Sequence, residues 1–214
     1  MVTVRTALKI IRENLNPGPG EQVPIIKAAG RVLKTDVRAH NDFPPYTCSA
    51  FDGYAIRVHD TETATVENPV DLKITRTITA GQMPGVALES SQAIRIMTGA
   101  PLPPEADAVV KQEEVEARKE RLCLRSSVKM GEGVRHKGSD AQKGERVIGE
   151  GSTIGPEEIG YIASLGVESV EVFARPKVAL LMIGNELIPP ETPLTPGKIN
   201  AGNAYMLSSL VCRY

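Results

Sequence analysis

VDLKITRTITAG, the stretch from residue 70 to residue 81, alternates apolar with polar side chains. A period of two predicts a β-strand that buries one face. The apolar face carries Leu72, Ile74, Ile78 and Ala80, and the opposite face carries Thr75, Thr77 and Thr79. Arg76 is the one polar interruption of the apolar face, and Gly81 ends the run.

More short strands are predicted on the C-terminal side of this run. Residues 93–97, 108–110 and 122–124 are short apolar segments separated by turns rich in proline, glycine or charge, and residues 118–120 read as a hairpin turn. Helices are expected where apolar residues recur at helical spacing or helix start and stop residues occur, namely at residues 4–15, 25–29 and 156–165. The pattern therefore predicts a mainly β protein with added α+β elements.

Composition limits the class of protein. The chain has 214 residues, 41% of them hydrophobic, and a formal net charge of -1. A packed core is feasible, and the charge balance gives no general attraction to nucleic acid or anionic membrane. No apolar run approaches the roughly 18 residues of a membrane span, so a cytoplasmic protein is expected. The three cysteines are far apart and form neither a disulfide framework nor a zinc motif.

The stretch NDFPPYTCSAFDGYAIR, residues 41–57, concentrates aromatic side chains in a segment that begins as a loop. Four of the chain's eight phenylalanines and tyrosines fall within it: Phe43, Tyr46, Phe51 and Tyr54. Aromatic rings gathered in a loop need burial, either in their own domain or against a partner.

Residues 178–183, VALLMI, form a continuously apolar run. Such a run is typical of a strand buried on both faces of a parallel sheet, which needs neighbouring strands and covering helices. Residues 204–211 then begin a helix. Residues 177–214 are therefore expected to open an α/β domain that is cut short; the alternative is an edge strand and a helix packed on the β domain.

Three short polar sites admit a purely structural interpretation. Asp52-Gly53 is a favoured turn dipeptide, and Thr98-Gly99 stands where a strand is expected to end. Glu186 is either a solvated loop residue or an acid placed at the carboxyl end of a strand, where α/β sheets bind ligands.

Four longer blocks resemble the MoeA-type molybdopterin molybdotransferases, a family that includes the E domain of gephyrin. They appear in the family's order between about residues 30 and 207. The blocks are FPPYTCSAFDGYAIR (43–57), RIMTGAPLPPEADAVVKQEEV (95–115), VRHKGSDAQKGERVIGEGSTIGPEEIGYIASLGV (134–167) and RPKVALLMIGNELIPP (175–190).

The resemblance implies an elongated N-terminal region of bent β-sheets in three parts. Residues 1–44 and 141–175 would form a discontinuous α+β subdomain, and residues 45–140 a β-rich subdomain inserted into it. Residues 176–214 would begin an incomplete α/β domain of the molybdopterin-binding type.

The resemblance also implies roles for particular residues. Asp52, Thr98 and Glu186 match active-site positions of the family, with Asp52 and Glu186 as ligands of a hard cation. Ser49, Gly53 and Gly99 would flank the bound substrate, although a bond to the backbone of its own turn is the favoured role of Ser49. The sequence departs from the family pattern at Ile183, where threonine is usual, and at Asn185, where many members have aspartate.

The activity implied by the resemblance is the Mg²⁺-dependent insertion of molybdate into adenylylated molybdopterin, with release of AMP. The substrates would bind at a composite site of a homodimer, where Asp52 and Thr98 of one subunit face Glu186 of the other. A 214-residue fragment is expected to be inactive alone. The alternative is a non-catalytic module for dimerisation or scaffolding.

Overall fold

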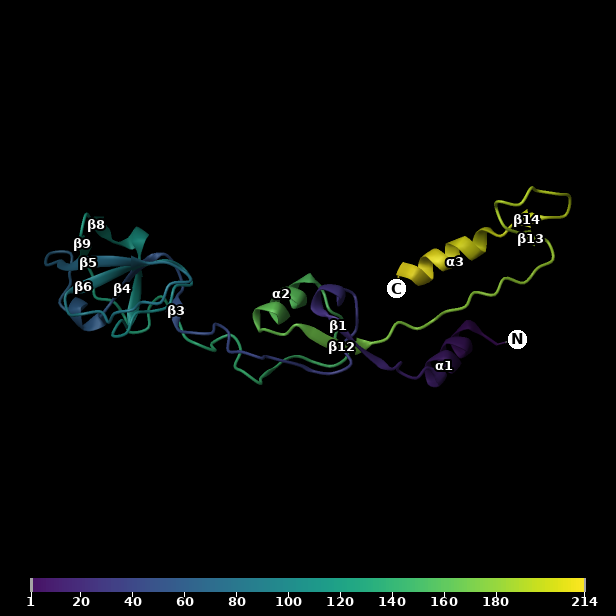
Figure 1. Ribbon diagram of the computed structural model, residues 1–214, viewed down its shortest axis with the longest axis horizontal. Helices are drawn as coiled ribbons and strands as arrows, with labels where there is room; N and C mark the ends of the chain where they lie inside the picture. The colour runs from purple at the N-terminus through teal and green to yellow at the C-terminus, as the bar shows by residue number, and fades with distance from the viewer. Residues whose placement is uncertain (1, 214) are drawn as a thin grey trace. The chain divides into compact units, whose positions relative to one another are not determined.

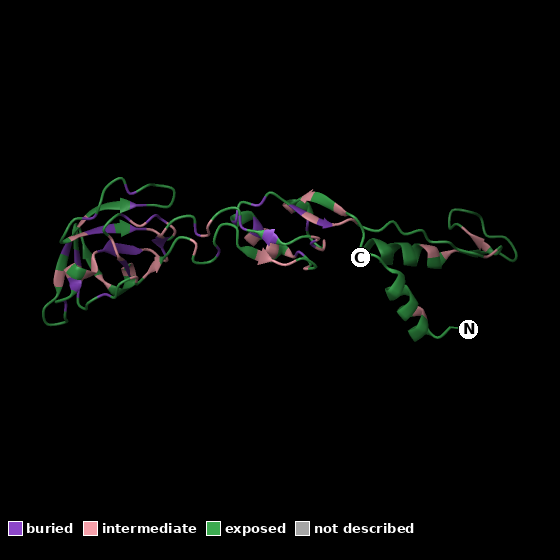
Figure 2. Ribbon diagram, turned by 90° about the horizontal axis from the view of Figure 1, so that it is seen from below, coloured by how far each residue is buried: buried purple, intermediate pink, exposed green. Residues whose placement is uncertain are grey.

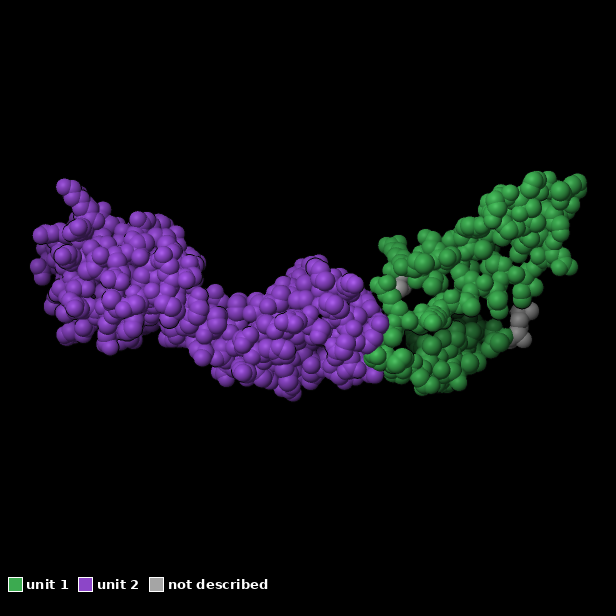
Figure 3. Space-filling view, in the orientation of Figure 1, with its two compact units in different colours: residues 1–20, 173–214 green, residues 21–172 purple. Residues whose placement is uncertain are grey.

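The computed structural model describes residues 2–213 and separates into two compact units. The larger unit comprises residues 21–172, and the terminal unit comprises residues 1–20 and 173–214, as Figure 3 colours them. Strands outnumber helices in the described chain, so the prediction of a mainly β protein is confirmed.

A six-stranded sheet is the principal element of the larger unit (Figure 1). Its strands are β4 (Gly53–Ile56), β5 (Val70–Ile78), β6 (Gln92–Ile96), β7 (Ala108–Lys111), β8 (Glu116–Arg118) and β9 (Arg121–Leu124). They lie in the order β7-β4-β6-β5-β9-β8. Strand β4 runs antiparallel to both of its neighbours, β6 and β7, whereas β5 runs parallel to β6. The expected hairpin joins β8 to β9, with Lys119 at a φ of 52° in its turn.

Hydrophobic clusters lie on both faces of the central part of this sheet, and all four residues of β4 are buried. One hydrophobic cluster includes Tyr54, Ile56, Leu72, Ala93, Ala108, Val110, Leu122 and Leu124. The other includes Ala55, Ile78, Leu88, Ile94, Ile96, Ala100 and Val109, with Phe51 packed against it. Because neighbouring residues of a strand point to opposite faces, the alternation of β4 between the two clusters places one cluster on each face.

Strand β5 changes face midway, which corrects the single apolar face predicted for residues 72–80. Its register with β6 shifts between Ile74 and Arg76, so that Ile74 lies opposite Ala93 and Ile78 lies opposite Ile96. Cross-strand partners share a face. Leu72 and Ile74 therefore pack in one cluster and Ile78 in the other. Ala80 lies beyond the strand and is exposed.

Gly53 is the first residue of β4 and not part of a turn, so the turn interpretation of Asp52-Gly53 is wrong for Gly53. A Cβ atom built on Gly53 would lie 2.0 Å from the carbonyl oxygen of Val110 in β7. No side chain larger than hydrogen fits at that distance. The absence of a side chain therefore lets β7 approach β4 closely.

A separate hydrophobic cluster of the larger unit is built from residues 28–39 and 141–172. Its fully buried members include Leu33, Ile154, Ile162, Leu165 and Val172. Helix α2 (Pro156–Ser164) begins where the Glu158 carboxylate accepts a hydrogen bond of 2.8 Å from the Gly155 amide. Gly166, with a φ of 78°, follows the Leu165 C-cap. Two small sheets accompany it, β1 (Gly20–Pro24) with β12 (Ser169–Phe173) and β2 (Val37–Arg38) with β11 (Arg146–Ile148).

The remaining elements of the larger unit are short. They are the strand pair β3 (Cys48–Ser49) and β10 (Val134–Arg135), and the 3₁₀ turns η1 (Ile25–Lys27), η2 (Val58–Thr61) and η3 (Gln112–Glu114). The helix predicted for residues 25–29 is thus a single 3₁₀ turn. All three cysteines are free, and burial raises the pKa of the Cys48 thiol.

The terminal unit contains α1 (Val4–Asn14), α3 (Gly202–Arg213) and the parallel pair β13 (Leu187–Ile188) and β14 (Ile199–Asn200). The side chain of Thr3 caps α1 by accepting the Thr6 amide hydrogen. Neither helix has a buried residue, and Figure 2 shows both almost entirely in the colour of exposed residues. Within residues 2–213 no helix has the length and apolarity needed to cross a membrane.

The buried strand predicted for residues 178–183 is not formed. These residues belong to no sheet in the described part of the chain, and all six are exposed, Leu181 by 84% and Ile183 by 91%. A strand buried on both faces requires neighbouring strands that accept its hydrogen bonds and helices that cover it. The described residues of the terminal unit provide neither to this run, so an apolar sequence alone does not produce the strand.

Gly53→Ala tests the close approach of β4 and β7. The new methyl group would collide with the Val110 carbonyl, and we expect the free energy of unfolding to fall by about 1–3 kcal/mol. Chemical denaturation followed by circular dichroism measures the change. Gly160→Ala is the matched control, because Gly160 lies in α2 with open space around it, and alanine there should add roughly 0.5–1 kcal/mol. A Gly53→Ala protein as stable as the parent would contradict the packing described.

Candidate functional site

Asp52 and Thr98 are joined by two hydrogen bonds, although 46 residues separate them in the sequence. The backbone amide of Thr98 donates to Asp52 Oδ1 over 2.8 Å, and the Thr98 hydroxyl donates to the same oxygen over 2.7 Å. Asp52 Oδ2 accepts no hydrogen bond from residues 2–213. One carboxylate oxygen is therefore fixed, and the other is left without a hydrogen-bond donor from the described chain.

The register of the sheet brings these two residues together. Gly53 at the start of β4 lies opposite Ile96 at the end of β6, and also opposite Lys111 at the end of β7. Because β4 is antiparallel to both strands, its first residue meets the last residues of its neighbours at one edge. We call the residues that gather there, Asp52, Thr98 and Gly99, the β4 edge.

Ser49 supports the β4 edge from a buried position. Its hydroxyl donates to the Phe51 carbonyl over 2.5 Å, and its own carbonyl accepts the Gly99 amide hydrogen over 2.9 Å. Only 1% of Ser49 is exposed. The favoured backbone role of Ser49 is thus what the geometry provides, and a direct contact of Ser49 with a ligand stays a prediction.

Gly99 has a φ of 75°, in the left-handed region that favours glycine. No heavy atom lies within 4 Å of the position that its Cβ would take. The backbone conformation, and not crowding, therefore explains the glycine. The space beside the Thr98-Gly99 peptide is open to a ligand.

Hydrogen bonds from Thr98 stabilise the ionised form of Asp52. The hydrogen bond from the Thr98 amide, followed by that from the Thr98 hydroxyl, lowers the pKa of Asp52 below its ordinary 3.8. Partial burial opposes the shift, and the positive charge of Arg95 adds to it. The Asp52 carboxylate is thus stabilised in its ionised form, with Oδ1 held by Thr98.

The single carboxylate of the β4 edge limits the kind of divalent cation that could bind there. No group of three or more histidine, cysteine, aspartate or glutamate side chains that could hold a metal occurs in the described chain. A site with a single carboxylate suits Mg²⁺, which keeps several waters and takes its remaining oxygens from a phosphate-bearing substrate. It does not suit structural zinc, which needs four protein ligands.

Glu186 lies in the terminal unit, in an exposed turn between Gly184 and β13. Its carboxylate folds back over Gly184, where an added Cβ would lie 2.5 Å from Oε1. The turn is attached to β14, because the Ile199 amide donates to the Glu186 carbonyl over 2.8 Å and Lys198 Nζ donates to the Asn185 carbonyl over 2.6 Å. Since residues 178–183 form no strand, the predicted position of Glu186 at the carboxyl end of one is wrong.

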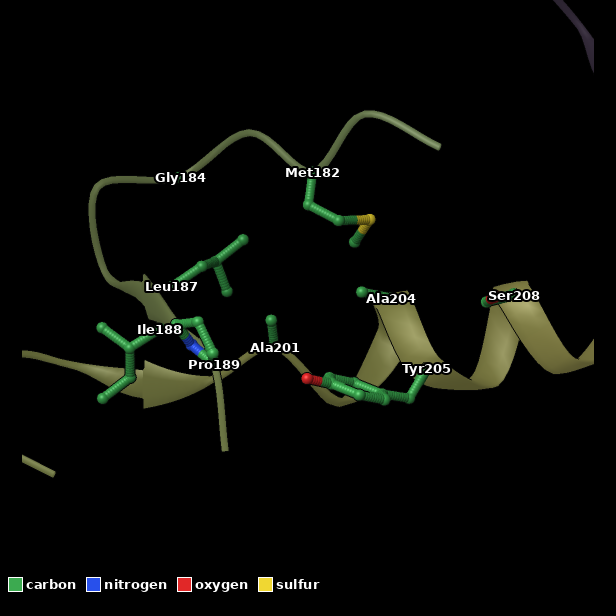
Figure 4. Close-up of a pocket in the computed structure, with 9 residues that line it drawn as sticks. All are labelled: Met182, Gly184, Leu187, Ile188, Pro189, Ala201, Ala204, Tyr205 and Ser208. Carbon is green, nitrogen blue, oxygen red and sulfur yellow. The ribbon is translucent and has the colours of Figure 1, made fainter. Parts of the chain in front are cut away.

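An open hollow of about 390 Å³ lies beside this turn (Figure 4). Met182, Leu187 and Tyr205 contribute side chains that border the space in the view. The small residues Ala204 and Ser208, one helical turn apart on α3, also line it. The four-residue spacing of these two small side chains is the only sequence signal of the hollow, and it is too common in helices to predict one.

Comparisons with known proteins agree with the fold. The family described as the MoeA N-terminal region (domain I and II) matches residues 2–166. Molybdopterin molybdenumtransferase 2 of Mycobacterium tuberculosis is 36% identical over 211 residues, covering 99% of this chain and 52% of the relative. The molybdopterin molybdenumtransferase of a Nostoc species is 38% identical over 191 residues, covering 89% of this chain and 44% of the relative.

A crystal structure of the molybdopterin biosynthesis moeA protein from Pyrococcus horikoshii OT3 superimposes on the chain with a TM-score of 0.91 at 34% identity. The match covers 100% of this chain and 57% of that one. The chain therefore spans about half the length of the curated relatives that it matches.

Thr98→Val tests the cause of the lowered pKa. The substitution removes the hydroxyl donor and keeps the amide donor, so the pKa of Asp52 should rise but stay below 3.8. Carboxyl-carbon NMR titration measures this, and Thr98→Ser should leave the pKa low. A carboxyl group whose pKa is lower in the folded than in the unfolded state stabilises the fold at pH values above its unfolded-state pKa. The contribution of Asp52 should therefore be present above pH 3.8 and disappear as the pH falls through the lowered pKa. An unchanged pKa in Thr98→Val would show that the hydroxyl bond is not formed.

Proposed function

The chain belongs to the MoeA family, whose N-terminal region it contains, and on that premise we propose that it supplies one half of the site at which molybdenum is inserted into molybdopterin. The reaction is the transfer of molybdate to adenylylated molybdopterin, with release of AMP. The substrates are the adenylylated pterin and the molybdate oxyanion.

The observation that carries the proposal is the Asp52–Thr98 pair. Asp52 is ionised, has one oxygen fixed by two donors, and leaves Oδ2 for a ligand. A bound Mg²⁺ would neutralise charge on the phosphate and molybdate oxygens. Asp52 would hold that ion, and Thr98 would hold Asp52.

The proposed role of the β4 edge is positioning. Reaction between two oxyanions requires that their charges be offset and their orientation fixed before any bond changes. The Asp52 carboxylate loses little further freedom on binding, because Thr98 already restrains it. The Thr98-Gly99 peptide, with open space beside Gly99, gives a bound oxyanion room to approach the backbone. No nucleophilic serine or cysteine is needed, and Cys48 is buried.

The second half of the proposed site is Glu186, contributed by another copy of the chain in a homodimer. Glu186 is exposed in its own unit, so its carboxylate is accessible to a partner. Asp52 and Glu186 would then give the cation one carboxylate from each copy, within the one or two that Mg²⁺ takes.

A second candidate function is an interaction module that acts without catalysis. The terminal unit favours it through exposed apolar side chains, including Leu181 and Ile183 before β13 and Met206 in α3. Exposed apolar surface of this extent is typical of a segment that another surface covers. The two functions are compatible, because a composite site also requires association.

A chimera tests the proposed function. Residues 1–214 would replace the matching half of the Mycobacterium tuberculosis relative, of which the match covers 52%. We expect the chimera to release AMP from adenylylated molybdopterin in the presence of molybdate and Mg²⁺. Asp52→Ala should lower the rate by about 100-fold, because the cation and the oxyanions lose their alignment.

Two controls accompany the chimera. Asp60→Ala removes a carboxylate of the same β-rich part that hydrogen-bonds Ser90 and Ser91 away from the β4 edge, and it should leave the rate unchanged provided that the protein folds. The unfused 214-residue chain should release little AMP. An Asp52→Ala chimera as active as the unmodified one, or a robust rate from the unfused chain, would refute the proposal.

A further inference from the structure

Arg95 occupies a position on β6 beside the β4 edge. It lies directly opposite Tyr54 of β4 and directly opposite Thr77 of β5. Asp52 precedes Tyr54 by two residues and lies just outside the strand. Arg95 is near enough for its positive charge to act on the Asp52 carboxylate, which lowers the pKa of Asp52.

The guanidinium of Arg95 is exposed and has no hydrogen-bond or ion-pair partner within residues 2–213. Two other basic side chains of the same sheet already have partners. Lys111, at the end of β7, pairs with Glu114 over 3.1 Å, and Arg76 of β5 donates to the Pro84 carbonyl over 3.4 Å. Asp52 Oδ1 accepts the hydrogen bonds from Thr98, and no ion pair joins Asp52 to Arg95 within the described residues. The positive charge of Arg95 is thus available next to a fixed negative charge.

We propose that Arg95 binds a tetrahedral oxyanion at the β4 edge and orients it against the Asp52–Thr98 pair. The proposal rests on the proposed function and adds to it a residue that holds the anionic substrate. Asp52 and Arg95 together place a negative and a positive side chain close to each other. The carboxylate suits a cation, and the guanidinium suits the oxyanion that accompanies the cation.

Arginine is suited to this role for geometric reasons. Its planar guanidinium donates two parallel N–H groups to two oxygens of one phosphate, and its charge is permanent at any pH that the protein tolerates. Molybdate and the phosphate of a nucleotide both offer such oxygens. A tetrahedral oxyanion is the shared chemistry, and titration with each anion separately identifies the source.

The plain alternative is a solvated surface arginine with no ligand. The two interpretations predict different effects on anion binding when Arg95 is replaced by an uncharged residue. Arg76→Gln is the matched control, because Arg76 is an exposed arginine of the same sheet. Its partner Ile94 packs in the cluster that includes Ile96, so Arg76 lies on the face opposite to Arg95.

The experiment is an NMR titration of the ¹⁵N-labelled 214-residue protein with sodium molybdate, inorganic phosphate and AMP in turn, read at the amides of Thr98 and Gly99. We expect saturable shifts with at least one anion. Arg95→Gln should weaken that binding by about tenfold or more, the loss expected for one charge-assisted contact. Arg95→Lys should recover part of it, and Arg76→Gln should bind like the parent. Thermal unfolding midpoints of all variants should match the parent, since these side chains are exposed.

Saturation with molybdate alone would support the proposal and identify molybdate as the occupant, and saturation with phosphate and AMP would identify the nucleotide phosphate. The proposal is overturned if no anion shifts the two amides, if Arg95→Gln binds as tightly as the parent, or if Arg76→Gln loses as much affinity as Arg95→Gln. Anion binding here does not depend on AMP release by the chimera, so failure of one proposal is distinguishable from failure of the other.

Discussion

Strand β4 is buried on both faces, and the position of the β4 edge depends on that burial. Ala55 packs in one hydrophobic cluster while Tyr54 and Ile56 pack in the other. Gly53 allows the Val110 carbonyl of β7 to approach where any Cβ would collide. Because β6 and β7 flank β4 with fixed register, the residue before Gly53 is brought beside the residues that follow β6. The Asp52–Thr98 pair is therefore a consequence of core packing.

Most of the larger unit could be predicted from the sequence, because its signals are local. The period of two in residues 70–78 predicts β5, and Pro156 and Gly166 predict the bounds of α2. The prediction that the apolar residues from Leu72 to Ala80 share one face was wrong for a reason that is not local. A bulge between Ile74 and Arg76 moves the later residues to the other face, and the cause is the register with β6, which is not a local property.

The candidate site was predictable only in part. The resemblance to a family indicated Asp52 and Thr98, but the two hydrogen bonds between them depend on register across β4 and β6. Gly53 looked like a turn residue because Asp-Gly favours turns, and only the position of Val110 shows its role. The prediction for residues 178–183 was wrong for the opposite reason. Their composition is typical of a buried strand, yet burial requires neighbouring strands and covering helices, which the described residues of the terminal unit do not supply.

The most direct test of the central claim is paramagnetic broadening by Mn²⁺, used as a probe for Mg²⁺, on the ¹⁵N-labelled 214-residue protein with inorganic pyrophosphate present. A cation held by the free oxygen of Asp52 should broaden the amides of Gly53, Thr98 and Gly99 first, and Asp52→Asn should abolish that selectivity. If the same amides broaden equally in Asp52→Asn, or if broadening centres on Glu113 and Glu114 instead, the β4 edge is not the cation site and the account is wrong.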